Sequence, residues 1–211
     1  MARAGGRSKQ ADERRRAVEA IGDSRAAREP WAASAFDTIA RTDDDELVRA
    51  AAVRGRGLSA GPETVERLLP LLSPAASKEC KPAPARVRWE TARVLRDLCT
   101  AHELPDPPRS AAAEALLARL AGDADRNVRI TAAEALGHLP DRRVPAALVA
   151  VLSERDFALE SAAARSLREL TGQSIDCDAA AWQEWLAKTP DPFAERGRRA
   201  EGRPWWQWWR R

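Results

Sequence analysis

One amphipathic segment recurs four times along the chain, and this repetition constrains the fold more than any other feature. The clearest copy spans residues 125–139, and looser copies begin near Asp45, Pro84 and Asp156. Repetition of one helix with a fixed apolar stripe is typical of solenoids, in which each unit packs on its neighbours. Most solenoids bind other molecules rather than catalyse reactions, so the repeat also favours a binding function.

The four copies can be aligned on one apolar position: Val48, Val87, Val128 and Leu159. Successive anchors are separated by 39, 41 and 31 residues, the length of a helical pair. The positions four, eight and eleven residues after each anchor fall on the same helical face. Leucine occupies the eighth position in three copies, whereas the first copy has Arg56. We therefore expect the first of these helices to end differently or to expose its last turn.

Each copy is preceded by a second amphipathic stretch, at residues 31–40, 63–72, 111–120 and 144–152. A degenerate segment at 12–22 is expected to form the inner helix of an N-terminal cap. Asp45, Asp125 and Asp156 each stand three residues before an anchor, where a carboxylate accepts hydrogen bonds from free N–H groups. The pattern predicts alternating helices joined by turns, two of which are long and rich in proline.

The chain after the last copy reads as a helix stop followed by one more helix. Gly172 suits a helix C-terminus, and Asp178 suits the N-cap of a new helix. Trp182, Trp185 and Leu186 would share one face of that helix and cover the end of the stack. The predicted fold is an all-α solenoid (an α-α superhelix) of four to five helical pairs. Its domains are a disordered basic N-terminus (1–11), the solenoid (12–172), a capping helix (173–187) and a flexible basic, Trp-rich tail (188–211).

The composition supports a helical, cytoplasmic protein. Tyrosine is absent and phenylalanine scarce, and the net charge of +3 arises at the two ends of the chain. No apolar run approaches the roughly 20 residues needed to cross a bilayer, and the N-terminus does not resemble a signal peptide. Cys80, Cys99 and Cys177 are far apart, which favours a reduced chain without disulfides or a zinc site. We expect a monomer with no cofactor.

The sequence at 128–137, Val-Arg-x-x-Ala-Ala-x-Ala-Leu-Gly, resembles the HEAT-repeat family, including bacterial HEAT-like proteins grouped with phycobilisome lyases. The ending at 170–185, Leu-Thr-Gly-Gln followed by Asp and Trp-x-x-Trp, resembles HEAT-repeat proteins of planctomycete-type bacteria. The resemblance covers roughly residues 12–186. It implies an α-solenoid, armadillo-like in architecture, that acts as a scaffold for protein–protein interaction.

Some proteins of this broad group are enzymes, so each activity is compared with the residues of this chain. HEAT-repeat hydroxylases bind two irons through several His-Glu dipeptides, but this chain has one, His102-Glu103. A bilin lyase would need a chromophore pocket and a cyanobacterial setting, and the sequence gives no sign of such a setting. HEAT-like DNA glycosylases use tryptophans and a carboxylate on a basic concave face, and this activity stays open as an alternative. No phosphate-binding loop or catalytic triad is apparent, so we predict a protein that is not an enzyme.

The candidate binding residues lie two, six and nine positions after the anchors, facing away from the partner helix: Arg54, Trp89, Arg93, Arg96, Arg165 and Arg168. Trp and Arg are the residues that most often dominate protein interfaces, which favours a groove for a protein partner. Nucleic-acid binding is the alternative, but Asp97 and Glu134 interrupt the stripe. A solvated arginine face without a partner is the third reading.

The C-terminal tail ends in a dense cluster of aromatic and basic residues: Trp205, Trp206, Trp208, Trp209, Arg210 and Arg211. Tryptophan prefers membrane interfaces and arginine would meet anionic head groups, so the tail could lie on a membrane surface. Two other readings are docking on a protein partner and folding back on the solenoid. The first of the three makes peripheral membrane association a second alternative function.

Overall fold

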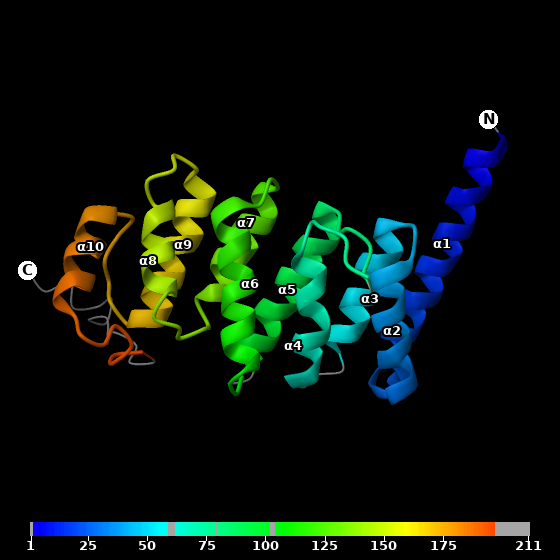
Figure 1. Cartoon of the computed structure of the whole chain (residues 1–211), viewed down its shortest axis with the longest axis horizontal. Helices are drawn as coiled ribbons and strands as arrows, with labels where there is room; N and C mark the ends of the chain where they lie inside the picture. Colours follow the sequence, from blue (N-terminus) through cyan, green and yellow to red (C-terminus); the bar gives the residue numbers. More distant parts are fainter. Residues whose placement is uncertain (1, 59–61, 79, 102–103, 197–211) are drawn as a thin grey trace, which may run out of the picture.

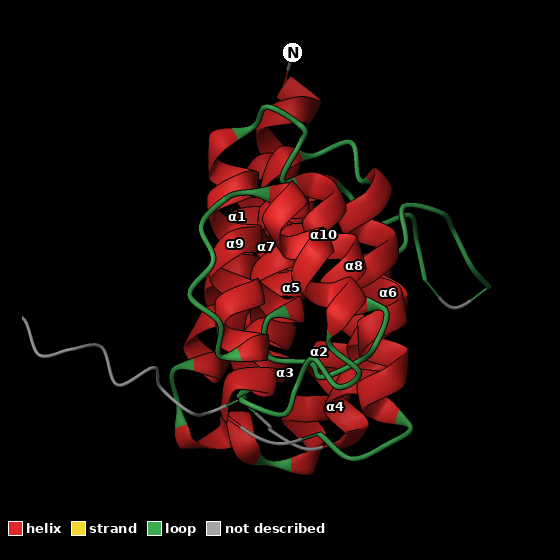
Figure 2. Ribbon diagram, turned by 90° about the vertical axis from the view of Figure 1, so that its left-hand side faces the viewer, coloured by secondary structure: helices red, strands yellow, loops and turns green. Residues whose placement is uncertain are grey.

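The computed structural model describes residues 2–58, 62–78, 80–101 and 104–196, in which all regular secondary structure is helical. The helices stand side by side in one elongated row (Figure 1) and form two layers when viewed from the end (Figure 2). The inner layer consists of α1 (Ala2–Gly22), α3 (Glu46–Gly57), α5 (Ala85–Ala101), α7 (Arg126–Leu136) and α9 (Phe157–Thr171). The outer layer consists of α2 (Pro30–Thr42), α4 (Pro62–Leu68), α6 (Pro108–Gly122), α8 (Val144–Val151) and α10 (Ala179–Lys188). The predicted α-solenoid is confirmed.

The layers follow from which helices touch. Each inner helix packs on the next, in the order α1, α3, α5, α7 and α9, and α2, α6 and α8 pack on the inner helices that follow them. The segment at 12–22 thus belongs to the inner layer, as predicted. Two short 3₁₀ helices, η1 (Arg25–Arg28) and η2 (Leu69–Leu72), complete the first and second pairs. Helix α10 packs on α8 and continues the outer layer.

The helix termini form as the sequence predicts. Asp45, Asp125, Asp156 and Asp178 each accept hydrogen bonds from two backbone N–H groups at the start of the following helix. These bonds satisfy donors that would otherwise lack a partner within the helix. Gly172 ends α9 with φ of 73°, a left-handed conformation in which glycine has no steric penalty.

The predicted apolar stripe forms the core between the layers. The anchor side chains are at most 1% exposed, and the leucines eight residues later, Leu95, Leu136 and Leu167, are fully buried. The residues four positions after the anchors are small and buried, which lets neighbouring helices approach closely: Ala52, Thr91, Ala132 and Ala163. At the C-terminal end Trp182 is completely buried and donates from its indole nitrogen to the carbonyl of Asp176 (2.9 Å).

The arginine that follows the anchor in three copies ties successive elements together. Arg49 donates to the carbonyl of Ala40 (2.8 Å), and Arg129 to the carbonyl of Leu120 (2.8 Å), in each case near the end of the preceding outer helix. Cationic donors suit these carbonyls because they are at the negative end of the helix dipole. Arg88 instead forms two hydrogen bonds of 2.7 Å with the carboxylate of Asp123, on the connection from α6 to α7.

The burial of Arg56 contradicts one of the two expectations for the first repeated helix, that it exposes its last turn. Its side chain is buried, at 5% exposure, and its Nε donates to Asp37 of α2 (2.9 Å). Its Nη1 donates to the hydroxyl of Thr64 in α4 (2.7 Å). A buried guanidinium is tolerated here because two outer helices supply oxygen acceptors.

The predicted domain boundaries stay predictions, and the segments beside two of them can be described. Helix α1 begins at Ala2. The segment from Ala2 to residue 11 contains no proline, and extending an existing helix costs far less than nucleating one. Residues 189–196, which follow α10, pack back on the solenoid. Gln173 donates to Glu195 (2.8 Å), and Arg196 donates to the carbonyl of His138 (3.0 Å).

Candidate partner-binding face

The predicted binding residues come from three inner helices. Arg54 belongs to α3, Trp89, Arg93 and Arg96 belong to α5, and Arg165 and Arg168 belong to α9. We call the surface of the inner helices that carries these residues the inner face. None of these side chains is fully buried, so the helical period correctly separated them from the core.

Carboxylates that were not recognised in the sequence pair with the arginines nearest α1. Arg54 contacts Glu19 of α1 (3.2 Å) and Glu90 of α5 (3.3 Å), and Arg93 contacts Glu90 (2.5 Å). The side chain of Glu90 is 2% exposed, so its charge is stabilised by the two guanidinium groups rather than by water. The ion pairs connect α1, α3 and α5 across the inner face.

A second group of ion pairs continues across the inner face to α9. Arg96 of α5 and Arg165 of α9 both contact Glu134 of α7, at 2.8 and 2.6 Å, and Arg96 also contacts Asp97. Burial alone would lower the pKa of Arg96, but its bonds with Glu134 and Asp97 outweigh burial and raise that pKa. Glu134 thus links three helices, although in the sequence it appeared to interrupt a basic stripe.

Trp89 lies between two guanidinium groups of its own helix. The Cζ atom of Arg86 is 5.3 Å from the centroid of the indole ring, and that of Arg93 is 5.9 Å away. These are cation–π distances, and both contacts hold the ring in a defined position. The partly exposed ring is therefore held in place on the inner face before any ligand binds.

A groove of about 630 Å³ crosses α3 between α1 and α5. Small residues on α3 open it, since Ala51, Gly55 and Gly57 contribute little side-chain volume. Its lining otherwise combines apolar and charged groups: Val18, Glu19, Asp23, Arg54, Leu58, Arg93, Val94, Asp97, Leu98 and Ala101. Two predicted residues, Arg54 and Arg93, thus border the groove, which can accept an apolar side chain flanked by groups of either charge.

The structure gives Arg168 a contact within the chain. Its Nη1 donates to the carbonyl of Ile175 (3.3 Å), in the connection from α9 to α10, so this residue helps to position the capping helix. The predicted tail residues, Trp205 to Arg211, lie outside the described residues, and the roles considered for them stay predictions.

Glu90 is the binding-face residue that the sequence could have revealed. It stands three residues after its anchor, and the corresponding residues in the other copies are Ala51, Thr131 and Ala162, all buried. A carboxylate in a position that otherwise holds small buried residues indicates a charged partner nearby. Glu19 had no such signal, because its partner, Arg54, is 35 residues away in the chain.

Within the described ranges, no group of three or more His, Cys, Asp or Glu side chains is placed to hold a metal ion. Cys99 is buried as predicted, and burial raises the pKa of its thiol to about 12, so it is not a reactive thiolate. In the same ranges, no helix is both long and apolar enough to cross a membrane.

Comparison with known proteins identifies the class of protein that this architecture represents. The sequence profile of the HEAT repeats matches residues 78–168 and again residues 113–196, which together exceed half of the chain. The chain therefore belongs to the HEAT-repeat family, whose members generally mediate protein–protein interaction and are typically not enzymes. No curated protein matches the sequence.

Proposed function

We propose that this protein is a non-enzymatic scaffold that binds a protein partner on its inner face, centred on the groove between α1 and α5. The observation that carries the proposal is the combination of this groove with Trp89 and Arg93 at α5. Rigid aromatic and arginine side chains beside a partly apolar groove are the usual composition of an interface hot spot.

The pairing of charges supports a protein partner over nucleic acid. Arg54, Arg93, Arg96 and Arg165 each contact at least one carboxylate of the chain. Strong nucleic-acid binding depends on uncompensated cations that neutralise phosphates and release counterions. A face that carries both positive and negative charges is instead complementary to a protein surface, which can offer charges of both signs in matching positions.

The experiment compares variants at Trp89, at Arg93 and at a second tryptophan, Trp31, in affinity capture from the source cells. Trp89→Ala and Arg93→Ala should abolish capture of the specific partner, because each removes part of the hot spot. Trp31→Ala is the matched control, since Trp31 is 56% exposed and lies on α2 in the outer layer. Capture that is unchanged in Trp89→Ala would contradict the proposed site.

Nucleic-acid binding, including base excision by a glycosylase, is tested by titration with duplex DNA over a range of salt concentrations. We expect no specific complex and no steep salt dependence, because the inner-face arginines already have counter-charges. Tight, salt-dependent binding that is lost in Arg165→Ala would favour this alternative. Peripheral membrane binding is tested by liposome sedimentation with and without residues 204–211, and equal sedimentation would exclude it.

A further inference from the structure

The outer layer is interrupted between α2 and α4. Each other pair of neighbouring outer helices is in contact, since α4 packs on α6, α6 on α8, and α8 on α10. Helices α2 and α4 make no comparable contact, and a groove of about 1020 Å³ lies between them. This groove, which we call the outer groove, is on the opposite side of α3 from the inner face. A gap in a row of packed helices has the shape to accept one more helix.

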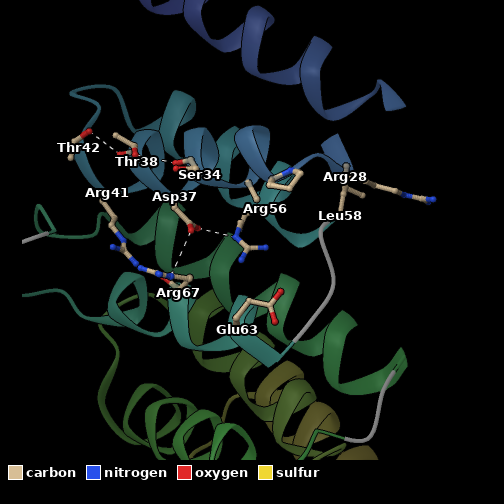
Figure 3. A pocket seen from close by; sticks show the side chains of 12 residues that line it. Arg28, Ser34, Asp37, Thr38, Arg41, Thr42, Arg56, Leu58, Glu63 and Arg67 are labelled. Carbon is tan, nitrogen blue, oxygen red and sulfur yellow. Dashed lines mark hydrogen bonds and ion pairs between the residues drawn. The ribbon is translucent and has the colours of Figure 1, made fainter. Parts of the chain in front are cut away.

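A buried arginine forms part of the floor of the outer groove. Asp37 and Arg56 point toward one another at its centre, with Arg41 and Arg67 beside them (Figure 3). The same carboxylate of Asp37 serves both Arg56, at 2.9 Å, and Arg67, at 4.0 Å. Arg56 occupies the position at which three other copies of the helix have leucine. The polar floor therefore results from a departure from the repeat, and the repeat itself does not require it.

Cations outnumber anions in the outer groove. The lining includes the four arginines Arg28, Arg41, Arg56 and Arg67, but the two carboxylates Asp37 and Glu63. Apolar surface adjoins them, because Pro30, Ala33 and Leu58 also line the groove, and Leu58 is 53% exposed. A ligand that matches both properties carries carboxylates along one side and apolar groups along the other.

We propose that the outer groove binds an acidic amphipathic helix of a partner protein. Carboxylates of the helix would pair with Arg67 and Arg41, and its apolar residues would cover Leu58 and Ala33. The C-terminal tail of this chain is the wrong occupant, because residues 197–211 carry five arginines and one glutamate. A nucleic acid is disfavoured, because its phosphate backbone offers no apolar groups to cover Leu58 and Ala33.

The test measures binding of a labelled helical peptide of about 15 residues, built from Leu, Ala and Glu, to the full chain by fluorescence anisotropy. A peptide with Lys in place of Glu is the control probe and should not bind. Arg67→Glu should weaken binding of the acidic peptide about tenfold or more, because a rim attraction becomes a repulsion. Its side chain is 59% exposed, so the reversal should leave the fold intact. Arg142→Glu, an exposed residue between α7 and α8, is the matched charge reversal and should change affinity by less than about twofold.

A steric variant distinguishes binding of the peptide inside the outer groove from a general attraction of the peptide to positive charge on the surface. Ser34→Trp places a large ring in the groove without changing charge, and it should also abolish binding. Equal weakening by Arg67→Glu and Arg142→Glu, or unchanged binding to Ser34→Trp, would overturn the proposal. So would equally tight binding of a single-stranded DNA of the same charge, or self-association of the chain that Ser34→Trp abolishes. Trp89→Ala should leave peptide binding intact, so this test is independent of the inner face.

Discussion

The α2–α3 and α6–α7 pairs are copies of one unit, but they pack differently at the same position. In α7, Leu136 is fully buried and continues the apolar core. In α3, the equivalent residue is Arg56, which is held by Asp37 and Thr64 of two outer helices. Grooves of about 1020 and 630 Å³ lie on the two sides of α3 at this turn. The departure from the apolar stripe at Arg56 thus coincides with a groove on each side of α3.

Glycines at the ends of α3 and α7 allow a further comparison of the two units. A Cβ atom on Gly55 would lie 2.6 Å from the ring of Phe36, and one on Gly57 would lie 2.6 Å from Val94. Both glycines are therefore needed for the close packing of α3, and they also leave the last turn of this helix narrow. At the end of α7, Gly137 serves the same purpose against Ser166. Close approach is common to both units, whereas the polar turn with a groove on each side is a property of α3.

We call α2–α3, which borders both grooves, the open unit and α6–α7 the closed unit. The largest expected effect concerns the ion pair that joins α5 to the closed unit. Arg88→Ala leaves the carboxylate of Asp123, whose side chain is fully buried, without its bidentate partner. Burial alone would raise the pKa of Asp123, and the bonds from Arg88 outweigh burial and lower it. We expect a loss of about 3–5 kcal/mol in the free energy of unfolding, measured by urea denaturation at neutral pH. Arg126→Ala, which breaks a more exposed ion pair with Asp156, should cost much less, because solvent screens that pair. Equal losses in both variants would show that burial does not distinguish these pairs.

In the closed unit, Leu136→Ala should cost about 3 kcal/mol, because it removes buried methyl groups and leaves a cavity. The same urea measurement checks this value. Acidic-peptide binding should be unchanged, since Leu136 lies in neither groove. A cost below about 1 kcal/mol would mean that the core beside α7 is loosely packed, contrary to the comparison.

In the open unit, Arg56→Leu restores the residue found in the other copies and should have a smaller effect on stability. The variant loses hydrogen bonds to Asp37 and Thr64 but gains apolar contact, so we expect a net cost of about 1 kcal/mol. Binding of the acidic peptide should weaken at the same time, because the groove loses a cation. A large loss of stability with unchanged peptide binding would mean that Arg56 serves the fold alone.

The sequence was a sufficient guide where each helix could be considered alone. The N-cap role of Asp125 and the burial of Val128 depend on local spacing and helical period, and both were predicted correctly. The role of Arg56 could not be predicted, because Asp37 and Thr64 come from two other helices and their approach depends on packing. The position of Glu90 in the repeat did indicate a charged partner, but that Arg54 is one of its partners depends on the packing of the neighbouring helix. Interactions between helices decide which arginines are paired with carboxylates. This pairing determines the charge that the inner face and the outer groove present to a partner.

The smallest effect concerns how the closed unit is joined to the last one. Asp156 accepts bonds from Arg126 on the preceding repeat, and the first repeat has Glu46 at the position that corresponds to Arg126. The hydrogen bonds from Arg126 and from the first N–H groups of α9 lower the pKa of Asp156 from 3.8 to about 2. Because the folded pKa is lowered, the stabilisation is present above the unfolded value and is lost as the pH falls from 3.8 toward about 2. A carboxyl NMR titration should show a higher pKa of Asp156 in Arg126→Ala, whereas Arg142→Ala should leave it unchanged. An unchanged pKa of Asp156 in Arg126→Ala would assign the lowered pKa to the N–H groups of the helix terminus alone. The ion pair with Arg126 would then not distinguish the closed unit from the first repeat, contrary to our inference.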